Sequence, residues 1–209
     1  MKNLLIVFLI FIFSALSFPA GSRADTTSGL VGRWTFDGKD TNWRTSKTND
    51  VSGQGNNGTL TSMSTTTTPV AGKIGQGFLF NGSNSYITGP TYNGVKTVSF
   101  WIKPNSTTQE IASLDTNLAS TSISNGTVLA NNFTSPTIYV DGVNTTTIGT
   151  GWHFVTITTA TAINASAIQI GKTGTGYYAG VLDDVRIYNR ALSASDVAQL
   201  YKQGAAISR

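Results

Sequence analysis

The chain of 209 residues has no cysteine, one histidine (His153) and one glutamate (Glu110), and only 11% of its residues are charged. The lack of cysteine excludes disulfides, thiol nucleophiles and cysteine-ligated zinc or iron–sulfur sites. A site that needs two histidines or two glutamates from one chain is excluded in the same way. The composition therefore removes whole classes of site before any motif is considered.

The first 24 residues have the layout of a secretory signal peptide. Lys2 gives a positive start, Leu4 to Phe18 is an apolar run, and Ser22-Arg23-Ala24 offers small residues on both sides of the arginine for cleavage after Ala24. The run is shorter than the ~20 residues that a membrane-spanning helix needs, so an uncleaved anchor is the less favoured alternative. We expect export to a secreted, extracellular or cell-envelope location, with a mature N-terminus at Asp25 and no membrane span.

Removal of the signal takes away Lys2 and Arg23, which lowers the formal net charge from +4 to +2. No basic stripe remains that would indicate binding to nucleic acid. The remaining length suits one domain with a substantial core.

The composition indicates β structure. There are 32 threonines and 22 glycines, and Asn-Gly and Asp-Gly turn dipeptides separate short runs in which every second residue is apolar. Three such runs are Val98–Ile102, Thr137–Val140 and His153–Thr158. Many short strands at this spacing predict two antiparallel sheets stacked as a sandwich.

The C-terminal region alone has a helical pattern. Val197, Leu200 and Tyr201 are spaced to share one helix face, Ser193 is a candidate N-cap, and Asp196 stands at the capping-box position. We expect a short helix that closes one end of the sandwich.

Five motifs occur in the order in which a known family has them. They are Gly32–Asp37 (GRWTFD), Asp50–Gly58 (DVSGQGNNG), Gly72–Gly82 (GKIGQGFLFNG), Val98–Lys103 (VSFWIK) and Gly180–Ser193 (GVLDDVRIYNRALS). Together they resemble the laminin-G-like, concanavalin A-like lectin/glucanase family of the bacterial secreted type. The resemblance implies an all-β fold, an antiparallel jelly-roll β-sandwich with a short C-terminal helix. We expect the domain over residues 29–203, after a signal peptide (1–24) and a linker (25–28) and before a tail (204–209).

One pair of motifs departs from the family order. Ile138–Gly142 precedes Trp152–Val155 here, whereas the Trp-His strand usually comes before the Tyr-Val-Asp-Gly hairpin. The order of the central strands therefore stays open.

The acidic residues do not predict an enzyme. Some enzymes on related sandwiches cleave β-glucans with two glutamates and an aspartate on one strand, and glycoside hydrolysis needs two carboxyl groups ~5–9.5 Å apart. Glu110 has no acidic partner at strand spacing, because Asp115 lies five residues away and faces the other side of a flat strand. His153 shares its strand face with Val155 and Ile157, and no G-x-S-x-G nucleophile accompanies it. We expect no catalysis, and a packed core or interface role for His153.

Two adjacent aspartates lie in the last long strand. Alternation places Asp183 on the side of Val181 and Val185, and Asp184 on the side of Arg186, where we expect a solvated ion pair. A carboxylate on the apolar side must find hydrogen bonds or a cation. Backbone amides at the strand end and a metal ion are both candidates for Asp183.

Many laminin-G-like domains carry a calcium ion, so the resemblance implies a structural calcium here as cofactor. Its candidate metal ligands are Asp37, Asp50, Asn56 and Asp183. Carboxylate, amide and turn carbonyl oxygens are the ligands that calcium prefers. Asp50 has an alternative role, which is to cap its own Asx-turn.

The resemblance favours a non-catalytic binding module whose partner is an extracellular glycan or a surface protein. A structural or adhesive envelope unit is the alternative, and a glycan-active enzyme ranks third. If the ligand is a sugar, the candidate ligand-binding rings are those beside turns, Tyr92, Tyr177 and Tyr178. Tyr177 and Tyr178 point to opposite faces of a strand, so we expect at most one of them to contribute.

Overall fold

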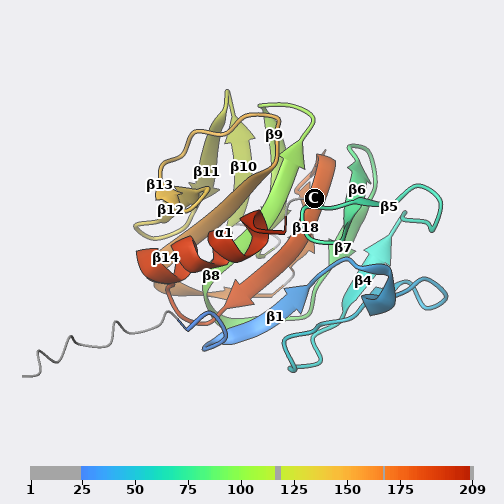
Figure 1. Ribbon diagram of the computed structural model, residues 1–209, viewed down its shortest axis with the longest axis horizontal. Coiled ribbons are helices and arrows are strands. Elements are labelled where there is room, and N and C mark those ends of the chain that lie inside the picture. Colours follow the sequence, from blue (N-terminus) through green and yellow to red (C-terminus); the bar gives the residue numbers. More distant parts are fainter. Residues whose placement is uncertain (1–24, 116–118, 167, 208–209) are drawn as a thin grey trace, which may run out of the picture.

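The computed structural model describes residues 25–115, 119–166 and 168–207. The predicted signal peptide lies outside the described residues. Two eight-stranded antiparallel sheets and a two-stranded hairpin contain all the named strands, and one helix, α1 (Ala194–Ala205), follows them (Figure 1). The predicted jelly-roll sandwich with a C-terminal helix is confirmed. Within these residues no helix is long and apolar enough to cross a membrane.

The first sheet, sheet A, has the order β13-β12-β14-β8-β18-β6-β5, and β1 pairs with β18. The three runs singled out in the sequence all form strands of this sheet, and β12 pairs with both β13 and β14. This pairing fixes the order of the central strands that the sequence left open. The strands of sheet A are β1 (Leu30–Trp34), β5 (Pro69–Ala71), β6 (Gln76–Asn81), β8 (Tyr92–Pro104), β12 (Thr137–Val140), β13 (Val143–Asn144), β14 (His153–Ala165) and β18 (Ala179–Tyr188).

The second sheet, sheet B, has the order β11-β10-β9-β15-β7-β4-β3-β2. Its strands are β2 (Thr41–Asn42), β3 (Lys47–Thr48), β4 (Gly58–Thr61), β7 (Tyr86–Thr88), β9 (Gln109–Ser113), β10 (Ser120–Ser124), β11 (Thr127–Asn131) and β15 (Gln169–Ile170). The hairpin of β16 (Lys172–Thr173) and β17 (Gly176–Tyr177) follows β15, and the 3-10 helix η1 (Gly38–Asp40) follows β1.

The main core lies between the two sheets. Trp34, Phe78, Ile87, Ile102 and Ile111 are among its fully buried side chains. Burying such side chains contributes roughly 1.5–3 kcal/mol each, which makes this layer the principal source of stability.

A second, smaller core lies on the outer face of sheet A, under α1. Figure 1 shows α1 crossing in front of β14 and β8. Trp101 and Phe154 from those strands pack there with Val197 and Leu200 of the helix. The predicted capping box is present, because the Ser193 hydroxyl accepts a hydrogen bond from the Asp196 amide and the Asp196 carboxylate accepts one from the Ser193 amide.

Gly204 supplies a test of this helix–sheet contact. A Cβ at position 204 would lie 2.5 Å from Nε1 of Trp101. Helix propensity alone favours Gly204→Ala by about 1 kcal/mol, but the close approach predicts a net loss of ~1–3 kcal/mol. Urea unfolding measures the difference, with Gln203→Ala on the exposed side of α1 as control. A Gly204→Ala protein at least as stable as the parent would contradict this packing.

Candidate functional site

The paired aspartates of β18 lie at a β-bulge. Asp183 pairs with Trp101 and Arg186 pairs with Ser99, so two residues of β18 oppose one residue of β8, and Asp184 takes a positive φ of 46°. The bulge interrupts the alternation of side chains along the strand. The expectation that Asp183 faces the core with Val185 is therefore wrong: Asp183 lies on the outer face of sheet A, on the side of Trp101.

Asp183 is fully buried on that face, beneath the loop between β5 and β6. Its Oδ2 accepts a 2.7 Å hydrogen bond from the Ile74 amide, while its Oδ1 is buried without a hydrogen-bond partner. Burial raises the pKa of this carboxyl to about 8; the Ile74 hydrogen bond opposes that change and the nearby Asp184 charge adds to it. A backbone amide was one of the two partners expected for Asp183, and the Ile74 amide fills that role. It forms a hydrogen bond with only one of the two carboxylate oxygens.

Asp184 forms ion pairs with two arginines. Its Oδ1 accepts from Nε of Arg33 at 2.7 Å and its Oδ2 accepts from Nη2 of Arg186 at 2.6 Å. Burial alone would raise the pKa of Asp184, but the guanidinium groups of Arg186 and Arg33 outweigh it and hold the pKa below its usual value. The expected Asp184–Arg186 pair is confirmed, but it is buried rather than solvated, because β1 brings Arg33 alongside β18.

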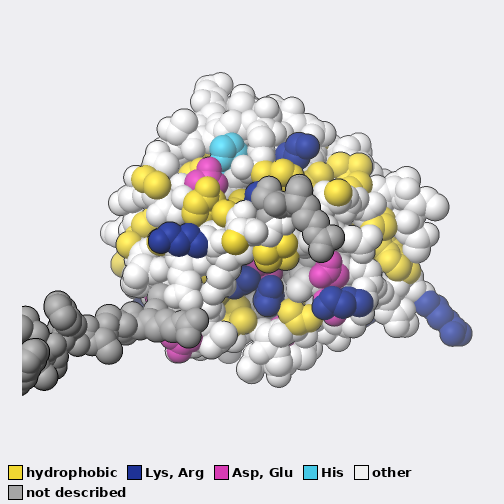
Figure 2. All heavy atoms as spheres, in the orientation of Figure 1, with side chains coloured by type: hydrophobic (Ala, Val, Ile, Leu, Met, Phe, Trp, Pro, Cys, Tyr) yellow, Lys and Arg dark blue, Asp and Glu magenta, His cyan; other side chains and the backbone are white. Residues whose placement is uncertain are grey.

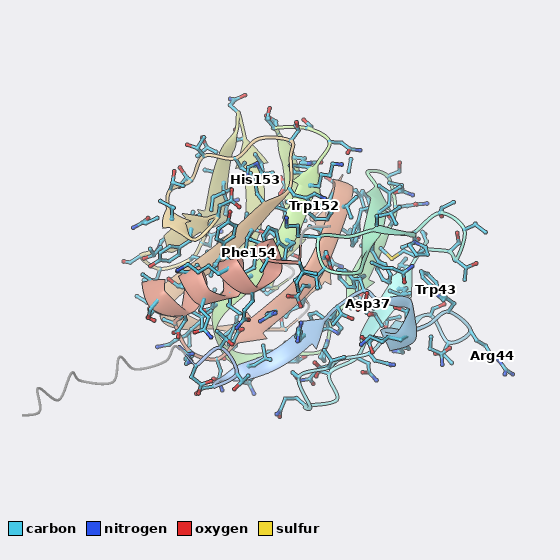
Figure 3. The ribbon with its side chains drawn as sticks, viewed as in Figure 1. Asp37, Trp43, Arg44, Trp152, His153 and Phe154 are labelled. Carbon is cyan, nitrogen blue, oxygen red and sulfur yellow. The ribbon has the colours of Figure 1, made fainter. Side chains whose placement is uncertain are left out.

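A polar pocket of ≈ 270 Å³ opens beside these groups. Asp37, in the loop after β1 (Figure 3), is one of its lining residues, and its Oδ1 accepts a hydrogen bond from the Gln76 amide. Asp37 thus holds the first residue of β6, two residues after the Ile74 amide that Asp183 holds in the β5–β6 loop. The pocket is lined by Arg33, Thr35, Asp37, Lys39, Asp40, Val51, Ile74, Asp183 and Asp184.

The other two candidate calcium ligands lie in the glycine-rich turn and are already hydrogen-bonded. Asp50 accepts from the amides of Arg33, Ser52 and Asn56 and from the Ser52 hydroxyl. The Asn56 side chain donates to the Val31 carbonyl. Asp50 thus makes the Asx-turn that was its alternative role, and Asn56 ties the turn to β1.

The structure buries two of the three tyrosines expected to bind sugar. Tyr92 is 5% exposed and packs edge-on against Trp34, and Tyr178 is fully buried against Phe80. The expectation for these two residues is wrong, since neither ring face is open to a ligand. Both lie next to a turn, Tyr92 as the first residue of β8 and Tyr178 between β17 and β18, and both rings are buried in the core.

The third tyrosine, Tyr177, forms a half-exposed pair with Tyr86. The two ring centroids are 6.3 Å apart at an angle of 54°, and Nζ of Lys172 lies 4.8 Å from the Tyr86 centroid and 5.4 Å from that of Tyr177. Tyr86 adjoins Ile87, which is fully buried, so Tyr86 points away from the core. Sequence reasoning missed Tyr86, although its alternation with Ile87 after the Asn81-Gly82 turn was a usable signal.

His153 lies at the start of β14 rather than inside the core. Its Nδ1 is 2.8 Å from Oδ2 of Asp141, and its Nε2 accepts a hydrogen bond from the Gly149 amide. These bonds assign the proton of the neutral ring to Nδ1. Figure 2 shows the histidine beside an acidic side chain on the face that carries α1. His153 is thus held by hydrogen bonds at the end of a strand, instead of packing in the core or at an interface as expected.

Glu110 lies on β9 of sheet B, beside the β16–β17 hairpin, where its side chain approaches Gly176. Its partner residue on β10 is Ser122, so the neighbouring strand offers no second carboxylate at that position. In the described part of the chain, no three acidic, histidine or cysteine side chains converge as a metal-binding group.

The fold and these sites were compared with known proteins. Residues 126–198 match the laminin G family model described as the concanavalin A-like lectin/glucanases superfamily. The resemblance inferred from the motifs is thereby confirmed. A search of curated protein sequences finds no match.

Solved structures with the same fold include carbohydrate-active and toxin proteins. Domain 4 of AbnA, an extracellular arabinanase of Geobacillus stearothermophilus, in complex with arabinotriose, is 22% identical, with 82% of this chain and 98% of that chain covered and a TM-score of 0.54. The binding domain of Paraclostridial Mosquitocidal Protein 1 is 18% identical (86% and 53% covered, TM-score 0.60). Trypanosoma rangeli sialidase is 17% identical (86% and 33% covered, TM-score 0.54). This chain spans about half of the mosquitocidal protein's binding domain and a third of the sialidase. At these identities the likeness shows the fold alone.

The buried state of Asp183 predicts a pH dependence of stability. Its pKa is about 8 in the folded protein against a reference value of 3.8, so the folded state retains the proton and stability falls as pH rises from about 4 to 8. We expect Asp183→Asn to flatten this part of the curve when unfolding is measured in the presence of a chelator. Glu110→Gln, on the other sheet, is the control, and the same slope in Asp183→Asn as in the parent would refute the assignment.

Proposed function

We propose that the chain is a secreted, non-catalytic module that binds carbohydrate outside the cell. The observation that carries the proposal is the half-exposed pair of Tyr86 and Tyr177, with the ammonium group of Lys172 near both rings. An aromatic ring offers an apolar face to the C–H side of a sugar, and its hydroxyl offers a polar edge. Lys172 adds donors for sugar hydroxyls.

The comparisons support a binding role. The arabinanase domain was solved with an arabinose trisaccharide, and the mosquitocidal protein contributes a domain named for binding. A surface protein remains the second candidate partner for this chain. The signal-peptide layout of the first 24 residues supports the secreted location in this proposal.

The absence of catalysis is part of the proposal. Glu110 faces Ser122 across β9 and β10, and glycoside hydrolysis needs a pair of carboxyl groups. The Glu110 side chain approaches Gly176, in the hairpin that carries Lys172 and Tyr177.

A glycan array on the purified protein tests carbohydrate recognition. For any glycan that binds, we expect Tyr177→Ala and Tyr86→Ala each to weaken the affinity about tenfold, which corresponds to ~1.4 kcal/mol, because each ring supplies stacking area. Tyr139→Ala, in sheet A, is the control and should bind as the parent does. Unchanged affinity in both pair variants would discard this site. Release of sugar that disappears in Glu110→Gln would contradict the non-catalytic assignment.

We also propose a structural calcium ion, with fewer ligands than the sequence suggested. Asp183 fits it, because its buried Oδ1 has no hydrogen-bond partner and lines the polar pocket together with Asp37. Asp50 and Asn56 do not fit, since neither lines this pocket and both carboxylate oxygens of Asp50 already accept hydrogen bonds in the glycine-rich turn. Calcium accepts carbonyl and water oxygens as well as carboxylates, so two aspartates suffice as its charged ligands. When bound, the ion would supply a positive charge beside the buried carboxylate of Asp183.

Calcium should therefore raise the melting temperature. At about 100 times its dissociation constant, a ligand specific for the folded state adds roughly 2.7 kcal/mol. Thermal unfolding in millimolar calcium and in chelator measures the difference. We expect Asp183→Asn and Asp37→Asn to abolish the shift, whereas Asp50→Asn lowers stability in both conditions and leaves the shift intact. Coincident melting curves for the parent protein would exclude the ion.

A further inference from the structure

One row of polar residues runs across the whole of sheet B. The strand pairings place one residue from each of the eight strands directly beside the next, so that the row crosses the strands. In spatial order these residues, the polar row, are Asn42, Lys47, Thr59, Thr88, Gln169, Ser113, Ser120 and Asn131.

The polar row faces away from the core. Its neighbours along the strands point inward: Leu60 follows Thr59, Ile87 precedes Thr88, and Ile170 follows Gln169, and all three are buried between the sheets. The helix α1, by contrast, packs on sheet A. Asn42 and Asn131 at the two ends are exposed, Ser113 is buried, and the other members are half-exposed.

The dimensions of the row suit an extended ligand. Adjacent strands lie ~4.8 Å apart, so seven steps span ~34 Å. A single sugar or short loop would cover only part of that length, whereas a linear polymer lying across the strands would meet an accessible polar side chain at every step except that of Ser113.

The side chains of the polar row favour one class of polymer as ligand. Hydroxyl and amide groups both donate and accept hydrogen bonds, as sugar hydroxyls do. The row holds one cation, Lys47, and no carboxylate, which is far less positive charge than a nucleic acid requires. It also has no large apolar side chain, whereas protein interfaces are enriched in aromatic residues at their centre.

The aromatic pair lies along the middle of the row. Tyr86 is two residues from Thr88 on the same strand and so on the same face, and Tyr86 in turn is paired with Thr61. Lys172 and Tyr177 follow Gln169 through the hairpin that continues β15. The two rings therefore lie beside the middle of the polar row. A sugar bound at the middle of the row would stack on them.

We propose that the polar row is the binding track for a linear, uncharged polysaccharide that crosses the strands of sheet B, with the Tyr86–Tyr177 pair as its central stacking point. The inference rests on the proposed carbohydrate-binding function and adds to it the shape, charge and direction of the ligand. Affinity should therefore rise with chain length until the oligosaccharide spans the row.

Calorimetry with β-glucan, xylan and arabinan oligosaccharides, from disaccharide to octasaccharide, tests this directly. Asn131→Ala, at one end, should leave the affinity for short oligosaccharides unchanged and weaken the longest about fivefold, as expected for one lost hydrogen bond. Lys47→Ala, one strand in from the other end, should do the same. Asn144→Ala, an exposed asparagine on β13 of sheet A, is the matched control, and equal melting temperatures establish that the variants are folded.

The outcomes separate the two proposals. Affinity that is independent of chain length, or unaffected by Asn131→Ala and Lys47→Ala, overturns the track while a loss in Tyr177→Ala still supports the proposed function. Binding confined to an acidic polymer such as polygalacturonate, and lost at high salt, overturns the uncharged ligand. No binding to any of these glycans overturns both.

Discussion

The buried carboxylate of Asp184 is the interaction on which the arrangement of sheet A depends. It joins Arg33 of β1 to Arg186 of β18, inside a strand that also pairs with β6 and β8. A buried charge without partners costs several kcal/mol, so the bulge that turns Asp184 toward both arginines must form together with the pairing of β1. The same bulge brings Asp183 to the outer face, which creates the polar pocket. Strand register, ion pair and pocket are thus consequences of one local backbone conformation.

Sequence reasoning succeeded where the backbone is regular. Strands β8, β12 and β14 alternate without interruption across the runs that were singled out, and the Ser193–Asp196 capping box depends on contacts within a few residues. It failed at Asp183, because one extra residue in β18 reverses the side to which a side chain points. A bulge of this kind depends on a partner, Arg33, that lies 151 residues away along the chain.

The binding residues were predicted only in part for a related reason. Tyr92, Tyr177 and Tyr178 all lie beside turns, and proximity to a turn does not specify which face of the strand is covered. Tyr177 acquires its partner, Tyr86, from β7, which is a long-range contact. The row across sheet B was likewise not accessible from the sequence, since each of its members comes from a different strand and only the pairing registers align them.

The borders of the two sheets have a consequence for assembly. Sheet A ends in β13, which has two residues, and in β5, which begins with Pro69, whereas sheet B ends in β2, also of two residues. At its other border the Val128 amide of β11 donates to the Thr146 carbonyl. Short borders, proline and a covering loop all discourage the addition of a further strand from another molecule. A protein with such borders resists growth into fibres, and the broad surfaces of the sandwich are left as the places where partners attach.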